Sequence, residues 1–420
     1  MKNIKAFLSF LDKTPSRFHT VSEMGRELRA NGYKELRERE KWQLKSGGRY
    51  YVERNGSSLI AFAIPESGFA PFRLMLAHDD SPCFMLKPCF EDTHEKAYVR
   101  LNVAKYGGLI INTWLDRPLS VAGRLVVRGK NGPEAKLANI DRDAVLIPNQ
   151  AIHLNHDANK GYQFNLQKDM MPLYGDADAK GGIIRELADS AGVEEKDILD
   201  ADLYLYSRSP ASVWGADNAY FSSGRLDDME CAYAGLRAVE RCGAHKAIAV
   251  LGVFDNEETG SESRQGAGST FLYDMLVRIC LSFGLTDSEI MAALADGELI
   301  SADNVHAKHP NFPEKSDSDN AVFMNKGIVV KHTADSRYAS DAMSTAWFIM
   351  LCEKAGVPVQ HYAERSDLTG GSTLSREAVM HIPMSMVDIG LAQLAMHSAY
   401  ETAGTADLTY LIKAFEKFWE

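Results

Sequence analysis

Histidine and carboxylate side chains recur in five short segments that lie far apart along the 420-residue chain. The segments are LAHDDSP (76–82), GRLDDME (224–230), FDNEETGS (254–261), SADNVHAKHPN (301–311) and AMHSAYE (395–401). Imidazole nitrogen and carboxylate oxygen are ligands that Zn²⁺ takes in proteins, and none of the segments contains a cysteine. We therefore predict that folding brings these segments together as the ligand set of a two-metal hydrolase.

Two of the segments come after apolar runs that are typical of buried strands. Glu257 and Glu258 follow the run 247–254 and precede a Thr-Gly-Ser turn signal. Neighbouring side chains at the end of a strand point in different directions, so one glutamate can bind a metal while the other holds a proton beside the bound water. His78 follows the run 72–77, and Asp80 lies two residues further on, where its carboxylate can orient the ring nitrogen that faces away from the metal.

The elements that must position these side chains alternate between strand and helix. Strand-like runs at 58–64, 72–77, 246–254, 327–332 and 384–389 are separated, from residue 227 onward, by stretches of helical periodicity. This alternation predicts an α/β fold in which helices flank a mostly parallel sheet. Metal ligands at strand ends also agree with the rule that sites in α/β folds lie at the carboxyl edge of the sheet.

Between residues 90 and 215 the pattern changes to short strands separated by turns, at Tyr98–Val103, Gly108–Trp114 and Leu119–Val127. We interpret 90–215 as a β-rich domain inserted into a catalytic domain formed by 1–89 and 216–420. An inserted domain leaves and re-enters the same sheet at neighbouring points. His78 and Asp227 can therefore meet at one site although a long stretch of sequence separates them.

With its motifs in the same order and at the same spacing, the whole chain resembles the aspartyl aminopeptidase family, metallopeptidase family eighteen. The resemblance implies two divalent ions per chain, with zinc as the first candidate and cobalt or manganese as alternatives. It implies that one carboxylate bridges the two ions and that two further ligands complete each of them: Asp227 as the bridge, His78 and Asp303 on one side, Glu258 and His397 on the other. Glu257 corresponds to the general base, with Asp80 beside it as a further catalytic residue.

Two metals about 3.5–4 Å apart can share a hydroxide, polarise the scissile carbonyl and stabilise the oxyanion. Glu257 would take the proton of the water and pass it to the leaving amine. By resemblance, the free α-amine of a peptide binds at one metal, so that a single N-terminal residue is removed, with Asp or Glu as the candidate residue. The resemblance also implies substrate-binding roles for Lys331, which would hold an acidic side chain, and for His153, which would enter the neighbouring subunit's site. His306 and Tyr338 are further substrate-binding candidates.

Three departures from the family pattern bear on the choice of substrate. The family usually has threonine at the position of Asp79, asparagine at that of Asp228, and a CGSTIGP-like segment where this chain has GGSTLSR (370–376). Additional carboxylates near a pocket would repel an acidic side chain, so neutral or basic N-terminal residues stay open. The wider clan that this chain resembles also implies a cis peptide bond between Asp227 and Asp228.

Composition excludes several classes of function. The formal net charge of −11 argues against nucleic-acid binding, because such proteins need a basic patch. The six cysteines form no CxxC pair, and we expect a reducing cytoplasm. No apolar run approaches transmembrane length, so we expect no membrane partner. The resemblance implies a homo-oligomer, in which the inserted domain builds a dimer and dimers assemble into a dodecamer.

Two other classes of function stay open. The chain could be a dinuclear deacylase or a peptidase of other specificity, which peptides with free and with blocked amines would separate from an aminopeptidase. It could also be a shell-forming scaffold that has lost its activity. The complete ligand set and the presence of Glu257 argue against a scaffold.

Overall fold

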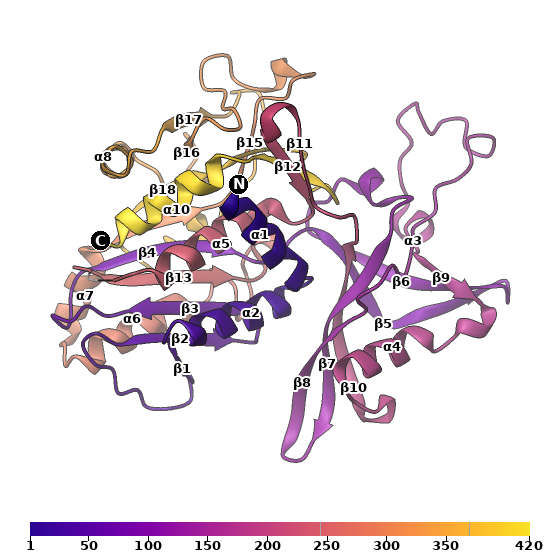
Figure 1. The fold of residues 1–420 in the computed structure, drawn as a ribbon, viewed down its shortest axis with the longest axis horizontal. Helices are drawn as coiled ribbons and strands as arrows, with labels where there is room; N and C mark the ends of the chain where they lie inside the picture. Colours follow the sequence, from indigo (N-terminus) through magenta and orange to yellow (C-terminus); the bar gives the residue numbers. More distant parts are fainter. Residues whose placement is uncertain (244, 369) are drawn as a thin grey trace.

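A nine-stranded sheet forms the centre of the larger lobe of the molecule (Figure 1). The computed structural model describes residues 1–243, 245–368 and 370–420. In spatial order the strands are β1 (Lys34–Leu36), β2 (Arg49–Arg54), β3 (Ser58–Ala63), β13 (Ile248–Phe254), β4 (Phe72–His78), β14 (Glu298–Ala302), β18 (Ser385–Gly390), β16 (Ile328–His332) and β17 (Val359–Ala363). Five of its eight neighbouring pairs are parallel, including every pair among β13, β4, β14 and β18. The predicted α/β fold with a mostly parallel sheet is therefore confirmed.

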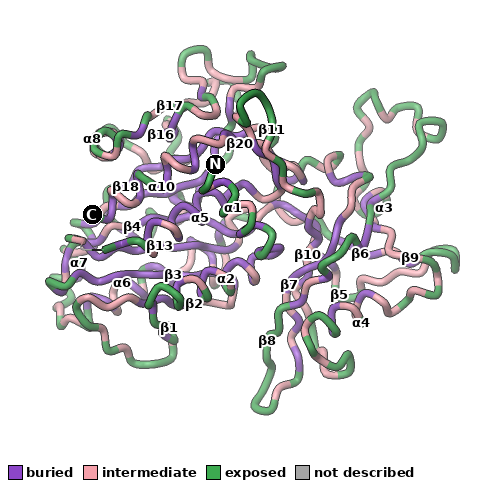
Figure 2. Tube along the Cα trace, in the orientation of Figure 1, coloured by how far each residue is buried: buried purple, intermediate pink, exposed green. Residues whose placement is uncertain are grey.

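Helices cover both faces of this sheet. One face packs against α1 (Lys2–Lys13), α2 (Arg17–Ala30), α5 (Leu226–Glu240), α8 (Ala342–Ala355) and α10 (Asp407–Phe418). The other face packs against α6 (Phe271–Ser282), α7 (Asp287–Ala295) and α9 (Ser375–Ala378). The central strand β4 supplies both cores, with Met75 and Ala77 on the first face and Leu74 and Leu76 on the second. This double burial explains why the strands are continuous apolar runs rather than alternating ones (Figure 2).

A second, six-stranded sheet forms the lobe at the right of Figure 1. Its strands are β8 (Gly132–Asn139), β7 (Leu119–Gly129), β10 (Ile198–Ser207), β5 (Cys83–His94), β6 (Tyr98–Tyr106) and β9 (Leu173–Asp176). All its pairs are antiparallel. The helices in this stretch are α3 (Leu166–Asp169) and α4 (Gly182–Ala191), and Ile183 and Leu187 of α4 pack into its core. The sheet is the β-rich part expected from the sequence, whereas the domain boundaries stay a prediction.

A third sheet has five short strands, several of which adjoin the ligand segments in the sequence. It consists of β11 (Ser212–Trp214), β12 (Tyr220–Ser223), β20 (Glu401–Gly404), β19 (Ala392–Leu394) and β15 (Val305–His306). Asp227 follows β12, His397 lies between β19 and β20, and Asp303 precedes β15. Three of the predicted ligands therefore lie next to strands of this small sheet, which the sequence analysis did not foresee.

The individual strand predictions can be compared with these bounds. The five runs predicted for the large sheet correspond to β3, β4, β13, β16 and β18, and two of the three predicted for the insertion correspond to β6 and β7. The prediction of a strand at Gly108–Trp114 was wrong, because Ile111–Trp114 forms a 3-10 helix. Gly107 has a φ of +69°, which ends β6, and the N–H of Ile110 donates to the carbonyl oxygen of His397 instead of to a neighbouring strand.

The parallel strands bring their carboxyl ends to one edge of the large sheet. In the register of β4 with β13, His78 is the partner of Phe254, and β14 runs alongside β4 in the same direction. At the end of β18, Gly390 allows a close approach, because a Cβ atom there would lie 1.9 Å from the carbonyl oxygen of Asp303. None of the helices among the described residues has both the length and the apolar character required to span a bilayer.

Candidate metal centre

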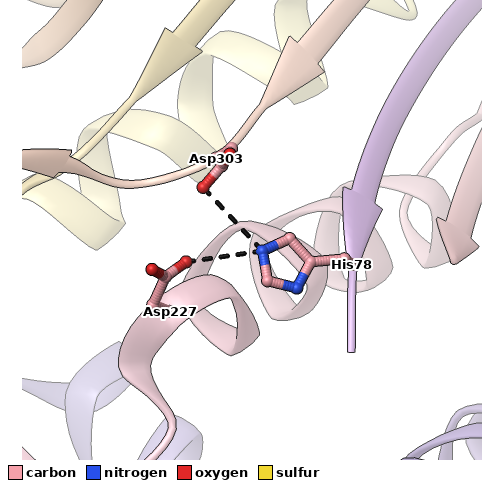
Figure 3. A group of neighbouring side chains, drawn as sticks. All are labelled: His78, Asp227 and Asp303. Carbon is pink, nitrogen blue, oxygen red and sulfur yellow. Dashed lines mark ion pairs between the residues drawn. The ribbon is translucent and has the colours of Figure 1, made fainter. Parts of the chain in front are cut away.

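The first half of the site surrounds His78, the last residue of β4. Its Nε2 atom lies 3.4 Å from Asp227 Oδ1 and 3.8 Å from Asp303 Oδ1. Figure 3 shows the imidazole directed between these two carboxylates, which come from the start of α5 and from the residue after β14. All three side chains are buried. A cation between them would therefore be shielded from solvent.

The second half of the site surrounds His397. Its Nε2 atom lies 3.5 Å from Asp227 Oδ2 and 3.3 Å from Glu258 Oε2. Asp227 thus presents one oxygen to His78 and Asp303, and the other to His397 and Glu258. The five predicted ligands are brought together in two groups that share Asp227.

Both imidazoles are oriented through their Nδ1 atoms. Nδ1 of His78 is 3.0 Å from the carbonyl oxygen of Asp80, and Nδ1 of His397 is 2.7 Å from the carbonyl oxygen of Gly108. A carbonyl oxygen can only accept, so each Nδ1 donates and each Nε2 is left to face the carboxylates. This is the tautomer that can bind a metal through Nε2.

Two oxygens of the predicted ligands are buried without a donor among the described residues. Among the described residues, Asp227 Oδ1 and Glu258 Oε1 lack a hydrogen-bond partner. Buried anionic oxygens of this kind are unfavourable unless a positive charge neutralises them. The ligand set contains nitrogen and oxygen without sulfur, and each group offers three side chains. The residues therefore fit two divalent ions.

The backbone around the ligands adopts uncommon conformations. The peptide bond between Asp227 and Asp228 is cis, as predicted. Arg225 and His397 have φ values of +62° and +66°, in the left-handed region that non-glycine residues rarely occupy. Asp228 is buried, and one of its carboxylate oxygens accepts the N–H of His78 at 3.4 Å. The ligand loops are thus held in conformations that neither a helix nor a strand would impose.

The carboxylate of Asp80 holds the backbone of both Glu257 and Glu258. Its Oδ1 accepts the N–H of Glu257 and its Oδ2 accepts the N–H of Glu258, each at 3.1 Å. The hydroxyl of Tyr106 donates to Oδ2 at 2.6 Å. Asp80 is therefore occupied by backbone and tyrosine donors, and its backbone carbonyl, more than its carboxylate, contacts the His78 ring at short range.

Two residues of this network were missed by the sequence analysis. Tyr106 is the last residue of β6 in the second sheet, and Arg17 begins α2. The Arg17 guanidinium donates at 2.6 Å both to the Tyr106 hydroxyl and to Asp255 Oδ1, and it lies over the rings of Tyr106 and Tyr204. Arg17 and Asp255 are 238 positions apart, so no local pattern could have indicated the pair.

Glu257 has the electrostatic environment of a proton acceptor. Burial raises its pKa to about 8, with further contributions from the carboxylates of Asp303, Asp80 and Asp227 and an opposing one from His78. A general base is most effective when its pKa is close to the working pH. Burial also raises the pKa of Glu258, although His397 opposes this.

The lysine predicted to bind substrate lies next to the predicted metal ligands. Lys331 is 2% exposed, and its Nζ donates to the carbonyl oxygen of Asn304 at 2.9 Å. The same atom is 3.8 Å from Asp303 Oδ2 and 5.5 Å from the centre of the Tyr338 ring. Burial lowers the pKa of Lys331, but Asp303 and Tyr338 outweigh this effect, so the amine stays charged.

His306 and His153 lie outside the ligand cluster. His306 is exposed on β15 and lines a cavity of about 420 Å³ together with Ala395 and Met396, the residues before His397. His153 is exposed in the loop that precedes α3 (Figure 1). Among the described residues, His153 belongs to none of the side-chain groups that could hold a metal ion.

The departures from the family pattern have different environments. Asp79 is buried, and both its carboxylate oxygens lack a partner among the described residues. Burial raises its pKa well above the ordinary value, and Asp255 and Asp80 add to this. In the segment 370–376, the hydroxyls of Thr373 and Ser375 donate to Asp388 at 2.6 and 2.7 Å. Asp388 therefore attaches this segment to the end of β18.

Sequence comparison relates the chain to known proteins over nearly its whole length. A family model described as aminopeptidase I zinc metalloprotease (M18) matches residues 10–419. A probable M18 family aminopeptidase 2 of Clostridium acetobutylicum is 43% identical over 424 residues, covering 99% of this chain and 98% of the relative. A protein of the same description from Pseudomonas aeruginosa is 36% identical over 426 residues, covering 99% of this chain and 97% of the relative.

Solved structures of related proteins also superpose on nearly the whole chain. Ape4, determined in complex with Nbr1, superposes with a TM-score of 0.94 at 31% identity and covers 99% of this chain and 84% of that one. The mApe1 dodecamer of S. cerevisiae superposes with a TM-score of 0.87 at 27% identity and covers 99% of this chain and 95% of that one.

Zinc titration of the metal-free protein tests the fit of the site. Burial lowers the pKa of His397, but Asp227 and Glu258 outweigh it and raise the pKa to about 10. A metal must displace this proton, so the apparent zinc affinity should rise by about tenfold per pH unit for each proton released, up to about pH 10. Calorimetry in two buffers of different ionisation enthalpy should show two ions per chain and net proton release. A single ion at saturation, or binding without proton release, would contradict the assignment.

Proposed function

This chain belongs to the M18 family, the aminopeptidase I zinc metalloproteases, and we propose that it removes single N-terminal residues from peptides by means of two divalent ions. The resemblance found in the sequence motifs is confirmed, and the chain is a zinc metallo-aminopeptidase. The number of ions, the role of each residue and the preferred N-terminal residue are parts of the proposal. Zinc is the expected ion, with cobalt or manganese as alternatives.

One observation carries the two-ion proposal. The two oxygens of Asp227 face different histidines, with Oδ1 at 3.4 Å from His78 and Oδ2 at 3.5 Å from His397. A carboxylate with one oxygen in each of two ligand groups can bridge two cations. Asp303 would complete the first group and Glu258 the second. Two bound ions would supply Lewis-acid activation of water and of the scissile carbonyl.

Glu257 then acts as the proton carrier. Its raised pKa lets it accept a proton from the attacking water and donate it to the departing amine. Asp80 holds the backbone of Glu257 and Glu258, so that one glutamate stays beside the reacting atoms while the other binds metal. Asp80 is thus a positioning residue in this proposal.

We propose Asp or Glu as the preferred N-terminal residue because the charged amine of Lys331 lies beside Asp303 at the edge of the ligand cluster. Tyr338 lies over this amine, and His306 lines the neighbouring cavity, so both are candidates for contact with substrate. The buried carboxylate of Asp79 opposes an acidic preference, since like charges repel.

We further propose that residues 90–215 form a dimerisation domain inserted between 1–89 and 216–420. Dimers of this kind would assemble into a dodecamer, in analogy with the mApe1 dodecamer of S. cerevisiae. The exposed position of His153 suits a residue that reaches a neighbouring subunit. The six cysteines are all free thiols, which supports a reducing compartment, proposed as the cytoplasm and testable by cell fractionation.

A panel of peptides tests the reaction itself. With zinc, cobalt or manganese supplied, the protein should release the first residue of peptides with a free α-amine and leave N-acetylated peptides intact. Release from acetylated substrates would indicate a dinuclear deacylase instead. Absence of hydrolysis with every metal and side chain would indicate an inactive scaffold.

Carboxylate-to-amide changes separate base from ligand. Glu257→Gln should keep both ions and lower kcat by about 10²- to 10⁴-fold, since it removes the proton acceptor alone. Glu258→Gln should weaken metal binding. Glu262→Gln, at an exposed position of the same segment, is the matched control and should change neither. Metal content and kcat are measured on the same preparations. Loss of an ion in Glu257→Gln would mean that Glu257, rather than Glu258, binds the metal.

Lys331→Met tests the acidic preference. It should lower kcat/KM for N-terminal Asp or Glu far more than for Leu or Ala, because an acidic side chain would lose its paired charge in a buried site. Lys326→Met, at an exposed position nearby, should leave the preference unchanged. Equal losses across all substrates would mean that Lys331 supports Asp303 and the fold rather than the substrate.

Complementation tests whether His153 serves a neighbouring subunit. Chains carrying His153→Ala and chains carrying Glu257→Gln should each be inactive as homo-oligomers. A mixed dimer would contain one site with an intact Glu257 and the partner's intact histidine, so co-expression should restore activity. His156→Ala, at an exposed position of the same loop, should be active by itself. Failure of co-purified mixed oligomers to regain activity would place any role of His153 within its own chain.

A further inference from the structure

Glu401 connects the bridging aspartate to one of the histidine ligands. It is the first residue of β20 and is 2% exposed. Its Oε2 accepts the N–H of Leu226 at 2.7 Å and that of Asp227 at 3.2 Å, and its Oε1 accepts the N–H of His397 at 2.7 Å. One carboxylate therefore holds the backbone of two proposed ligands that are distant in sequence.

The local backbone explains why these ligands require such a group. Arg225, Ala395 and His397 all have positive φ values, of +62°, +55° and +66°. Although Asp227 is at the start of α5, its own φ and ψ are not helical. The N–H groups of these loops therefore have no ladder of a strand or helix to donate to. In their place, the three donors converge on Glu401.

A carboxylate suits this arrangement better than an amide or hydroxyl would. Donors reach both of its oxygens, and a group that only accepts can satisfy all three. In glutamine, the NH₂ group would face the N–H of Leu226 and Asp227 or that of His397, so one side of the contact would be lost. Burial, together with the nearby charge of Asp227, raises the pKa of Glu401 to about 8, which two adjacent divalent ions would lower.

We propose that Glu401 is a positioning residue of the metal centre, which holds Asp227 and His397 at the separation needed to bind the ion that they share with Glu258. The proposal rests on the two-ion site of the proposed function. It assigns Glu401 no contact with substrate. In this arrangement the affinity for the second ion depends on a residue that does not itself bind the ion.

Zinc titration of Glu401→Gln tests this role without relying on peptidase activity. The variant should bind one ion with unchanged affinity and the other about 10- to 100-fold more weakly, as is typical when a partner of a metal ligand is lost. Competition with a chromogenic chelator measures both affinities, and mass spectrometry of the native protein gives the stoichiometry. Activity should return at zinc concentrations that saturate the weaker site.

A double-mutant cycle identifies which ion is affected. If Glu401 acts through the ion at His397, adding Glu401→Gln to His397→Ala should weaken metal binding little further. Added to Asp303→Ala, which removes a ligand of the other ion, it should weaken binding by nearly its full separate effect. The opposite pattern would overturn the proposal. If Glu401→Gln does not fold, Glu401→Asp keeps both oxygens on a shorter side chain and should weaken the same ion.

Asp407→Asn provides the matched control for a structural role. Asp407 is also 2% exposed, and its two oxygens accept the N–H groups of Asn325 at 2.5 Å and Gly327 at 3.0 Å, in a loop that carries none of the proposed ligands. This variant should lower the Tm and leave the zinc titration unchanged. Wild-type affinity for both ions in Glu401→Gln, or equal weakening in both variants, would reduce Glu401 to a fold-supporting residue. A wild-type protein that binds two ions without releasing N-terminal residues would contradict the proposed function alone.

Discussion

Many carboxylates are buried at one edge of the large sheet, and the rest of the site depends on how their negative charge is compensated. Asp79, Asp80, Asp227, Asp228 and Glu401 are each at most 4% exposed, and Arg17 and Lys331 are the buried cations beside them. The desolvation penalty of a buried charge amounts to several kcal/mol unless hydrogen bonds or cations compensate it. At Asp80 and Glu401, hydrogen bonds from backbone N–H groups compensate part of this penalty. Among the described residues, oxygens of Asp227, Asp228, Asp79 and Glu258 still lack a donor, and the one on Asp227, Oδ1, faces His78.

The fold meets this constraint by ending parallel strands at one place. His78 ends β4, and Asp303 follows the adjacent β14, so the direction of the central strands alone brings these two residues together. Asp227 and His397 are instead positioned by loops next to β12, β19 and β20, which contain residues of positive φ. Sheet topology therefore determines the positions of His78 and Asp303, and hydrogen bonds between loops determine those of Asp227 and His397. Ligands on loops depend more than ligands at strand ends on residues such as Glu401, whose side chains hold the backbone.

The same division explains how much could be predicted from the sequence. Apolar runs that precede His78 and Glu257 are local signals, and they correctly indicated the strands β4 and β13 and the fold class. The strand expected at Gly108–Trp114 was wrong because Gly107 turns the chain at a φ of +69°. Tyr106, Arg17 and Glu401 were missed because their contacts join distant segments, such as Arg17 with Asp255. Neither periodicity nor local spacing indicates a contact between distant segments. The family motifs indicate the ligands but not the residues that hydrogen-bond to them.

The end of β6 shows that the second sheet contacts the candidate metal centre itself. Tyr106 donates to Asp80 on one side, and two residues later the carbonyl oxygen of Gly108 orients His397 on the other. Between them, Gly107 packs so closely that a Cβ atom there would lie 3.2 Å from the Cβ of Glu258. A side chain at this position would press on a proposed ligand, and the positive φ also favours glycine. Because a single turn after β6 contacts groups on both sides of the candidate centre, any movement of the second sheet relative to the first would be transmitted to both imidazoles and to the loop that carries Glu257.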